Sequence, residues 1–599
     1  MIILGITMGI NSSCCLMVNG EVIAAQQEER FKRKKNYDTW PGLSIKSCLK
    51  IANLRTDQID KVVWAGKDPI FMDYFLTKRY SSYSNKDMIS EQYLWWKKKI
   101  YENKKINYLD LFEEKIDKSQ SPGKKILSSY LLIKKEDEKK IFSKNFKELL
   151  IRKELGINSS KLVCIEHHEC HAYYSICNKK DFKEKHLIFT VDGSGDNGIN
   201  ATVSILKNKK IKRLFETKNF IVGRIYRHIT LILGMKWGEH EYKTMGLAPY
   251  SSNYHSDGPY RIFNKCLDLK FKKKVSVKKN LKDCYFSFLK PLSYYRFDGI
   301  AQGVQRFAEN KILKWFSFWI KRLNIKNISY SGGVSMNVKV NKEISLLNDI
   351  NTFRVNGSGS DESLSIGACY AYAHKNNIKV KPLKNLYLGF SENNEDILKN
   401  IKKLNKRKYL IKKNPSNEYI AELIKKGFIL GRCKGKMEFG SRALGNRSII
   451  ADPSSFETIN KINRKIKSRD FWMPFAPSVN EELAKKYFKI KKGVDYTQMT
   501  VCVDTNSKYK KIIPAVLHPS DHTARIHLVK KENNKDYHDL IKRFYRKTKI
   551  GLLLNTSLNL HGKPIARNSV DCIEILENSD IDGIQIESYL VLKKLKKSS

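Results

Sequence analysis

The sequence predicts a mixed α/β fold with two domains, one over residues 1–380 and a second over residues 386–599. Two observations support this division. The 599 residues are enough for two or three domains, each with its own core. Composition also shifts at 374–386, where polar and Lys-rich residues with a proline precede a strand-like segment at 386–390. Strand-like and helical patterns occur on both sides of this shift, so each part is expected to fold independently.

Two strand–turn–strand units form the expected framework of the N-terminal domain. Each has a polar, Gly-containing turn after its first strand, as in the actin, hexokinase and heat-shock-chaperone superfamily, where such turns face nucleotide phosphates from both halves of a cleft. We therefore predict a duplicated actin/hexokinase-like ATPase fold. The expected strands are Ile2–Ile6, Cys14–Val18 and Glu21–Ala25 in the first unit, and Leu187–Val191, Ala201–Leu206 and Ile211–Phe215 in the second.

A Gly-Gly pair follows another expected strand, Asn327–Ser331. Gly332 and Gly333 precede a helix that carries Asn337 and Asn341. Without side chains, the pair lets the backbone approach a nucleotide closely. Taken alone, the pattern is more typical of an ordinary turn between a strand and a helix.

Residues 68–155 are rich in Lys, Tyr, Trp and Phe and show helical periodicity in parts. We expect a mainly helical insertion that lies over the cleft or forms a partner surface. Its aromatic residues Tyr93, Trp95, Trp96 and Tyr101 could stack on sugar rings, but packing as helix core is the favoured alternative. Basic residues among aromatics could also bind RNA, although a solvated helical face is the simpler expectation.

The motif His167-His168-Glu169-Cys170-His171 follows the apolar segment Leu162–Ile165. On a helix, His167 and His171 share one face with Cβ atoms about 5–6 Å apart, close enough to bind one metal ion. The pair by itself is more often a surface or packed helix than a metal site. Asp192 and Asp361 lie in Gly-rich turns, where carboxylates suit hard or borderline cations, and they shift the balance towards a metal site.

The C-terminal third contains cations and short polar side chains among Gly, Pro and aromatic residues. Guanidinium forks, an ammonium and short hydroxyl or amide groups at loop ends are suited to a small phosphorylated anion. Scattered surface charges are the alternative, but solvated charges do not need such special turns. The residues concerned are Lys436, Arg442, Arg447, Lys467, Arg469, Arg525, Asn555, Thr556, Ser557 and Asn559.

The formal net charge of +51 at first suggests nucleic acid or an acidic membrane as a partner. The excess is mostly Lys spread along the whole chain, so we discount it and do not expect nucleic acid. The twelve cysteines form no Cys-x-x-Cys pair, which favours free thiols in a reducing cytoplasm. No run reaches 18 apolar residues, and we expect no membrane span.

Eight blocks of the sequence resemble, in the same order, the motifs of the NodU/CmcH carbamoyltransferase family. Members of that family carbamoylate nodulation factors, cephalosporins and aminoglycosides. The resemblance covers nearly the whole chain apart from about 68–155. The blocks are EERFKRKKN, HHECHAYYS, VDGSGDNG, EYKTMGLAPY, SGGVSMNVKVN, MEFGSRALGNRSIIADP, FWMPFAPS and LLLNTSLN.

The resemblance implies an ATPase-like N-terminal domain joined to a YrdC-like C-terminal domain. The C-terminal domain is expected to take carbamoyl phosphate and release phosphate and carbamate. The carbamate then passes internally to the N-terminal domain and is adenylated by ATP, giving carbamoyl-adenylate and pyrophosphate. A hydroxyl of a sugar or secondary metabolite finally takes the carbamoyl group and AMP leaves. Free carbamate decomposes in water, so an enclosed route would protect it.

The resemblance also implies roles for individual residues. It assigns a divalent metal, Fe²⁺ or a similar ion, to His167, His171, Asp192 and Asp361. It places Gly332, Gly333 and Asn337, with Gly193 and Ser194, at the ATP site, and it gives catalytic roles to Lys35, Lys436 and Arg442. The residues assigned to carbamoyl phosphate are Lys436, Arg442, Lys467, Arg469, Arg525, Asn555 and Ser557.

The sequence departs from the family pattern in its first turn. Ile10-Asn11 stands where members usually carry His-Asp, and Asn36 follows Lys35 where His is frequent. If that His transfers a proton, its loss costs on the order of 10²–10⁴ in rate. Two alternatives to O-carbamoylation stay open. The fold relationship and the basic charge make a tRNA threonylcarbamoylation-type enzyme conceivable, and loss of the first-turn His would suit a non-catalytic nucleotide- or glycan-binding relative. The protein could form an oligomer.

Overall fold

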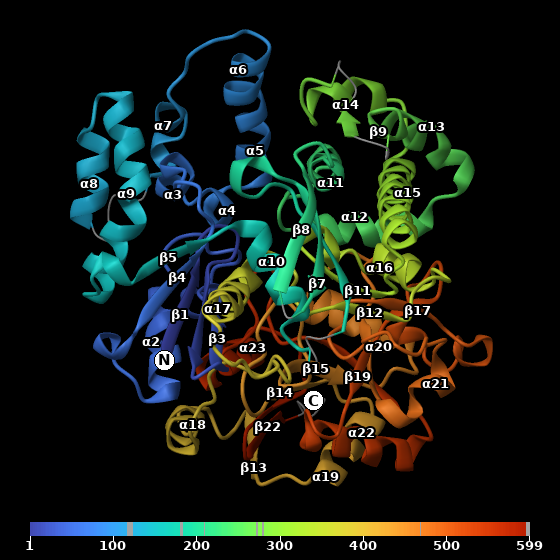
Figure 1. Ribbon diagram of the computed structural model, residues 1–599. Coiled ribbons are helices and arrows are strands. Elements are labelled where there is room, and N and C mark those ends of the chain that lie inside the picture. Colours follow the sequence, from blue (N-terminus) through green and yellow to red (C-terminus); the bar gives the residue numbers. More distant parts are fainter. Residues whose placement is uncertain are drawn as a thin grey trace. The chain divides into compact units, whose positions relative to one another are not determined.

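The computed structural model describes residues 1–116, 124–179, 184–208, 210–270, 274–277, 281–467 and 469–594. It divides into two compact units, Met1–Leu383 and Lys384–Ser599 (Figure 1). Within the described ranges, no helix is both long and apolar enough to cross a membrane. All twelve cysteines lie in these ranges and are free thiols.

The first sheet of unit 1 has the strand order β3-β2-β1-β4-β5. Antiparallel pairs join β1 to β2 and β2 to β3, while β4 runs parallel to both β1 and β5. Asn19 and Gly20 both have positive φ (48° and 76°), as a tight hairpin turn between β2 and β3 requires. The strands are β1 Ile2–Thr7, β2 Ser13–Val18, β3 Glu21–Gln27, β4 Lys61–Ala65 and β5 Leu162–Ile165.

The second sheet of unit 1 repeats this plan with the order β8-β7-β6-β11-β12. Again the first three strands form antiparallel pairs, and the last two run parallel to β6. The two sheets therefore match in strand order and direction, and the strands expected in both lie within two residues of those observed. The strands are β6 His186–Val191, β7 Ala201–Lys207, β8 Lys210–Thr217, β11 Asn327–Ser331 and β12 Thr352–Val355.

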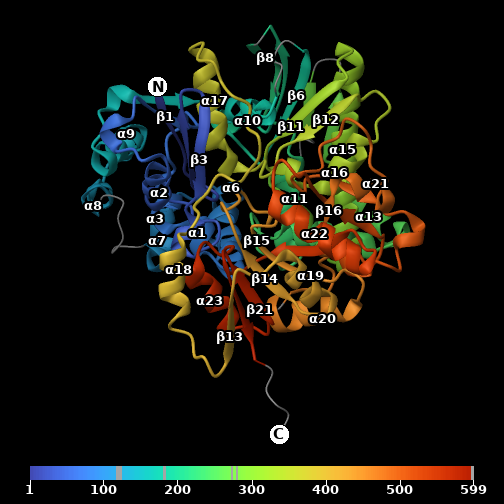
Figure 2. The same ribbon diagram turned by 90° about the horizontal axis from the view of Figure 1, so that it is seen from below.

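Two helices each follow one sheet and pack on the other. Helix α10 (His167–Ile176) follows β5 but packs on β6 and β11, whereas α17 (Leu364–Lys375) follows β12 but packs on β1, β2 and β4 (Figures 1 and 2). The two helices also pack against each other. Gly367 of α17 lies against Cys170, where a Cβ atom would overlap the carbonyl oxygen of Cys170. This close approach is available only to glycine.

Residues 72–155 fold mainly as helices. Their buried residues Tyr83, Met88, Tyr108 and Phe146 form one core cluster with Trp64 of β4. The helices are α3 Met72–Thr77, α4 Arg79–Ser82, α5 Asn85–Glu91, α6 Lys98–Ile100, α7 Tyr108–Leu111, α8 Lys124–Leu132 and α9 Glu136–Leu155, with a π-helical turn at Gln92–Lys97.

The aromatic residues of this segment divide between core and surface. Trp95 is partly buried against the core and meets Tyr108 edge-on, with ring centroids 5.2 Å apart. Tyr93 and Tyr101 are 40% and 41% exposed and both contact Phe286. The favoured expectation of a helix core therefore holds for Trp95 but not for these two tyrosines.

Of the remaining helices of unit 1, α1 and α2 pack on the first sheet, and α15 packs on the second. The longest, α15, packs on it through Phe316, whose ring stacks on Phe189 of β6 with centroids 3.8 Å apart. The other elements are α1 Glu29–Lys32, α2 Gly42–Ala52, α11 Val222–Ile232, α12 Glu241–Leu247, α13 Asn253–Asn264, β9 Leu267–Lys270, β10 Lys274–Val277, α14 Phe286–Leu292, α15 Phe297–Leu323 and α16 Val338–Ser345.

Unit 2 is built on an eight-stranded sheet with the order β13-β22-β21-β14-β15-β20-β16-β19, and β17 and β18 form a separate pair. The strands are β13 Tyr409–Lys413, β14 Leu430–Cys433, β15 Arg447–Ala451, β16 Ala476–Asn480, β17 Cys502–Asp504, β18 Thr523–Arg525, β19 His527–Val529, β20 Leu552–Ser557, β21 Gly583–Ile586 and β22 Tyr589–Lys593. The helices are α18 Asn394–Ile401, α19 Asn417–Lys425, α20 Phe456–Ile462, α21 Ala484–Tyr487, α22 Lys535–Thr548 and α23 Ser569–Glu577.

The core of unit 2 lies between this sheet and the helices α19 and α22, where Leu540, Ile541 and Phe544 pack with Leu430 and Leu553. One sequence prediction here is wrong. Residues 386–390 do not form a strand; they make a single bridge between Tyr387 and Glu438, because their partner segment turns away into the loop at 439–446.

Replacing Gly367 by Ala should destabilise unit 1 by about 2–3 kcal/mol. Alanine gains about 1 kcal/mol of helix propensity, but its Cβ must displace the backbone of α10 rather than a flexible side chain. Denaturant unfolding followed by circular dichroism measures the change. Lys375→Ala, at the 45% exposed end of the same helix, should change the free energy of unfolding by less than about 1 kcal/mol. Equal stability of the two variants would contradict this account of the helix contact.

Candidate functional site

The first turn of α10 is fixed by acidic side chains that the sequence analysis did not single out. The Glu166 carboxylate accepts hydrogen bonds from the backbone N–H groups of His168 (3.0 Å) and Glu169 (2.8 Å), and it is paired with Arg213. The N–H of His167 donates to Asp196 at 2.8 Å. Three free N–H groups of the helix start are thereby satisfied, which fixes the direction of the histidines.

His167, His171, Asp192 and Asp361 come together at this helix. One ligand atom from each lies within 4.8 Å of all the others. The His171 Nε2 atom is 3.1 Å from Asp192 Oδ2 and 3.8 Å from Asp361 Oδ1, and His167 Nε2 is 3.9 Å from each of the same two oxygens. Two imidazole nitrogens and two carboxylate oxygens thus converge on one point.

Neighbouring groups orient these side chains. The Asp192 carboxylate accepts hydrogen bonds from the N–H groups of Gly193 (2.5 Å) and Gly333 (2.8 Å), and His171 Nδ1 lies 3.3 Å from the hydroxyl of Ser331. The Nε2 atom of His167 is buried and has no hydrogen-bond partner among the described residues. A buried nitrogen without a partner, aimed at two carboxylates, fits a divalent metal ion such as iron, zinc or manganese.

His168 has a different role from its neighbours. Its Nδ1 atom lies 2.7 Å from the hydroxyl of Thr190, and its Nε2 atom lies 2.9 Å from the carbonyl oxygen of Ile199. Both ring nitrogens are used within the fold, and burial lowers the pKa of His168 to about 3. This histidine is therefore a neutral structural link from α10 to the second sheet.

The carboxylates govern the protonation of the cluster. Burial acts to lower the pKa of His167, but Asp192 and Asp361 outweigh it and raise this pKa to about 9. The two histidines in turn hold the pKa of Asp192 well below its usual value, against the effect of burial. A metal ion that binds here must therefore displace a proton from the cluster near neutral pH.

The glycines expected at the nucleotide lie beside Asp192. Gly332 has φ 101°, and a Cβ there would overlap the carbonyl oxygen of Val191, so only glycine fits this turn. Gly333 and Gly193 donate to Asp192, as described above. Ser194 is exposed. Asn337 caps α16 by accepting from Val340 N–H at 3.1 Å, and its amide pairs with Gln305.

Lys35 lies 3.5 Å from Glu239, a partner that sequence patterns did not indicate, and its side chain is 28% exposed. Ile10 occupies the first turn between Gly9 and Asn11, both of which have positive φ (131° and 63°). The amide oxygen of Asn11 is buried without a partner among the described residues. The aliphatic Ile10 side chain can neither accept nor donate a proton.

In unit 2, the predicted anion-binding residues occupy different environments. The buried Lys467 ammonium is surrounded by oxygens of two residues, Ser557 (hydroxyl at 3.3 Å) and Asn559 (carbonyl at 3.1 Å, amide oxygen at 2.5 Å). The amide of Asn555 donates to the Ala443 carbonyl oxygen (3.0 Å) and to the Ser478 hydroxyl (2.9 Å). These residues are therefore joined by protein contacts.

The other cations among these residues differ in their burial. Lys436 is exposed, and Arg442, Arg469 and Arg525 are half-buried, with the guanidinium of Arg469 lying 5.4 Å from the ring centre of Phe475. Arg447 is fully buried and donates to the carbonyl oxygens of Gly435 (3.0 Å), Asn446 (2.9 Å) and Arg567 (3.2 Å). It holds the loop in place and is unsuited to binding an anion.

Glu438 organises the loop at 439–446. One of its carboxylate oxygens accepts hydrogen bonds from the N–H groups of Leu444 (2.7 Å), Asn446 (2.8 Å) and Arg447 (3.0 Å). The loop is thus wrapped around a buried carboxylate. The sequence motif contains Glu438, but it did not indicate that its carboxylate accepts hydrogen bonds from the backbone of the loop.

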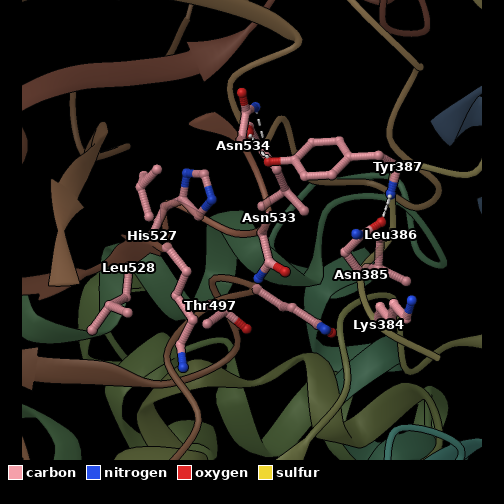
Figure 3. A pocket seen from close by; sticks show the side chains of 13 residues that line it. Lys384, Asn385, Leu386, Tyr387, Thr497, His527, Leu528, Asn533 and Asn534 are labelled. Carbon is pink, nitrogen blue, oxygen red and sulfur yellow. Dashed lines mark hydrogen bonds between the residues drawn. The ribbon is translucent and has the colours of Figure 1, made fainter. Parts of the chain in front are cut away.

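A pocket of unit 2 lies between residues 384–387, 497–498 and 527–534 (Figure 3). Tyr387 OH, which donates to the Leu444 carbonyl oxygen at 2.7 Å, also accepts from the amide of Asn534 at 3.3 Å. His527 lines the pocket, and its Nδ1 atom lies 2.9 Å from the Ser478 hydroxyl. Ser478 thereby links His527 to Asn555. Burial lowers the pKa of His527 to about 3, so the ring is neutral.

Comparison with known proteins decides the family. A family model described as "Carbamoyltransferase N-terminus" matches residues 2–370, and a model described as "Carbamoyltransferase C-terminus" matches residues 421–593. The chain belongs to the carbamoyltransferase family. As a member of it, the protein is an enzyme that transfers carbamoyl groups, and the resemblance inferred from the sequence blocks is confirmed.

Relatives of this carbamoyltransferase include both uncharacterised and named proteins. An uncharacterised protein of Methanocaldococcus jannaschii is 31% identical over 99% of this chain and 99% of its own length. Nodulation protein NolNO of Sinorhizobium fredii is 26% identical over 98% of this chain and 79% of its own length. The 3'-hydroxymethylcephem-O-carbamoyltransferase of Amycolatopsis lactamdurans is 29% identical over 27% of this chain and 30% of its own length.

Replacing His167 by Ala should lower the affinity for Mn²⁺ or Zn²⁺ by more than about 100-fold, because it removes a direct ligand. Wild-type protein should release about one proton per ion bound at pH 7, given the raised pKa of His167. Isothermal titration calorimetry in buffers of different ionisation enthalpy measures both quantities. His255→Ala, which removes a histidine of α13 outside the cluster, should bind as wild type. Unchanged affinity in His167→Ala would exclude the cluster as the site.

Lowering the pH from 7 to 5 should destabilise unit 2 by about 2 kcal/mol through His527 alone. Its pKa is about 3 in the folded state and 6.5 when unfolded, so the unfolded state binds the additional proton between these values and stability falls as the pH falls. Calorimetry at both pH values should show this loss in wild type. His527→Asn should lack this part of the pH dependence, and an identical pH dependence in both proteins would refute the assignment.

Proposed function

We propose that this enzyme is an ATP-dependent O-carbamoyltransferase. It moves the carbamoyl group of carbamoyl phosphate, by way of carbamoyl-adenylate, to a hydroxyl group of a sugar or secondary metabolite. The observation that carries the proposal is the convergence of His167, His171, Asp192 and Asp361 beside the glycine turns at 193 and 332–333. The cephem relative, whose name states O-carbamoylation, supports a hydroxyl acceptor.

The architecture of unit 1 supports a nucleotide site. Two sheets of equal order and direction, each with a Gly-containing turn after its first strand, are what a duplicated ATPase-like fold requires. In the second sheet, the turn after β6 and the turn after β11 meet at Asp192. Backbone N–H groups in such turns are suited to phosphate oxygens. We therefore assign ATP to this face of unit 1.

The four clustered side chains would hold the divalent ion, for which iron or a similar ion is the expected choice. Such an ion, when bound, neutralises negative charge on phosphate oxygens. In the adenylation step, a carbamate oxygen forms a bond to the α-phosphorus of ATP and pyrophosphate leaves. In the transfer step, the acceptor oxygen forms a bond to the carbamoyl carbon, AMP leaves and the hydroxyl proton is released.

Lys35 is the residue of this chain that we assign to the transfer step. Its ammonium, steadied by Glu239 at 3.5 Å, can stabilise negative charge on the carbamoyl oxygen as the acceptor attacks. With Ile10 in the first turn, the proton of the acceptor must leave through another group. We expect a slower transfer than adenylation for this reason.

Carbamoyl phosphate is assigned to unit 2, which we propose to be the YrdC-like domain. Lys436 and the half-buried Arg442, Arg469 and Arg525 are the cations that we assign to its phosphate group. Lys467 has three N–H donors, and oxygens of Ser557 and Asn559 already surround it. We therefore give Lys467 the role of positioning Ser557 and Asn559, and Asn555 the role of holding the loop at 439–446 through Ala443.

Fe²⁺-loaded protein without an acceptor should release pyrophosphate from ATP only when carbamoyl phosphate is present. A coupled pyrophosphate assay under anaerobic conditions measures this half-reaction. His167→Ala should lower the rate by at least 100-fold, since it removes a metal ligand, whereas His255→Ala should keep the wild-type rate. ATP binding without any carbamoyl-phosphate-dependent pyrophosphate would refute the adenylation step and leave the nucleotide site standing.

A further inference from the structure

Arg227 of α11 lies at the edge of the metal cluster, although no sequence motif indicated it. Helix α11 begins beside the glycine turns. A Cβ on Gly223 would come within 2.8 Å of Val334 and 3.3 Å of the Asp192 carbonyl oxygen. Arg227 is one turn further along and on the same helix face. Its Nη2 and Cζ atoms lie 3.0 and 3.2 Å from the place where a Gly193 Cβ would be.

The guanidinium of Arg227 is not used by an ion pair. Among the described residues, no carboxylate lies within 4.0 Å of it. Arg227 acts to lower the pKa of Glu241, which burial raises. The Glu241 carboxylate already accepts a hydrogen bond from Gly238 N–H at 2.5 Å. The guanidinium instead lies over the ring of Trp237, with Cζ 4.7 Å from the ring centre. The N–H edges of the guanidinium therefore stay available.

Trp237 is held from a second side by the helical segment at 72–155. The guanidinium of Arg79 lies 4.3 Å from the Trp237 ring centre. Arg79 is 1% exposed and forms a bidentate pair with the fully buried Glu91, from Nε to Oε1 (3.0 Å) and from Nη2 to Oε2 (2.5 Å). The hydroxyl of Tyr74 and the indole N–H of Trp96 both donate to Glu91 at 3.3 Å. Arg79 is thus rigidly placed.

The same segment is also joined to the loop that carries Trp237. The side-chain amide of Asn85, at the start of α5, donates to the Gly234 carbonyl oxygen at 2.5 Å, and α5 packs against α11 (Figure 1). A continuous series of contacts therefore runs from the buried Arg79–Glu91 pair through Trp237 to Arg227. It ends at the turn that contains Asp192.

We propose that Arg227 binds phosphate oxygens of the nucleotide at the metal cluster, and that Trp237 positions it with support from Arg79. The inference rests on the proposed ATP site. A guanidinium fork recognises phosphate with two parallel hydrogen bonds, and it does so best when stacking has already fixed its plane. The four side chains of the cluster, two imidazoles and two carboxylates, would all bind the metal ion. None of them would then offer a positive charge to the phosphates. Arg227 supplies that charge.

Titration calorimetry of full-length, Mn²⁺-loaded protein with ATP and with inorganic pyrophosphate tests this role. Arg227→Gln should weaken both ligands by about 10- to 100-fold, because it removes a charge-assisted pair of hydrogen bonds. Arg224→Gln, one turn earlier on the exposed side of the same helix, should change neither by more than about 2-fold. Metal content and thermal midpoint of Arg227→Gln should equal those of wild type.

Trp237 variants test positioning. Trp237→Phe keeps an aromatic face over the guanidinium and should stay within about 3-fold of wild type for ATP, whereas Trp237→Leu should approach Arg227→Gln. A purely structural role of Trp237 would lower the thermal midpoint in both variants without this difference in affinity. Equal ATP affinity of the two variants at equal metal content would overturn the positioning role.

The outcomes separate the two proposals. If wild type binds ATP and Arg227→Gln binds it equally well, the role of Arg227 is wrong while the nucleotide site stands. If wild type binds neither ATP nor pyrophosphate, both are wrong. Should Arg227→Gln fail to fold, Arg227→Lys replaces it; this variant keeps the charge but not the fork, and about 5-fold weaker binding is expected. Wild-type affinity in Arg227→Lys would then overturn the proposal.

Discussion

The contact between α10 and α17 at Gly367 is the constraint on which the site of unit 1 depends. Helix α10 carries His167 and His171, and α17 starts directly after the short turn that contains Asp361. Helix α10 packs on the second sheet, which precedes α17, and α17 packs on the first sheet, which precedes α10. The distance between the two helices therefore fixes how far the imidazoles lie from the Asp361 carboxylate. A side chain at position 367 would push apart groups that must converge within 4.8 Å.

Buried charges in both units are held by backbone groups and fixed partners. The half-buried Glu166 and the buried Asp196 bind the N–H groups at the start of α10. Glu438 binds three N–H groups of its loop, and Arg447 donates to four carbonyl oxygens. Such groups cost free energy to bury unless they are fully hydrogen-bonded, and here they determine the shape of the site loops. The Lys-rich composition, by contrast, contributes little to these loops.

The sequence was sufficient for features with a local period. Short apolar segments joined by Gly- and Asn-containing turns predicted the strands of both sheets, and the helical repeat placed His167 and His171 on one face. It was not sufficient for contacts between distant segments. The Arg227–Trp237–Arg79 series joins three elements with no shared spacing, and the partners of Lys467 and Glu438 depend on how loops close. Residues 386–390 looked like a strand because their apolar composition indicates a buried segment. Composition does not indicate whether a neighbouring strand is present to pair with that segment.

Two imidazoles and two carboxylates form a donor set of intermediate hardness, and this has a consequence for how the protein would behave in a cell. Manganese, iron and zinc all accept such ligands, and intrinsic affinity rises along the first transition series whatever the reaction needs. The site geometry alone does not reject zinc. The identity of the bound ion would therefore follow the metal supply of the cell, and protein made in zinc-rich medium would carry a different ion from protein made under iron-replete, anaerobic conditions.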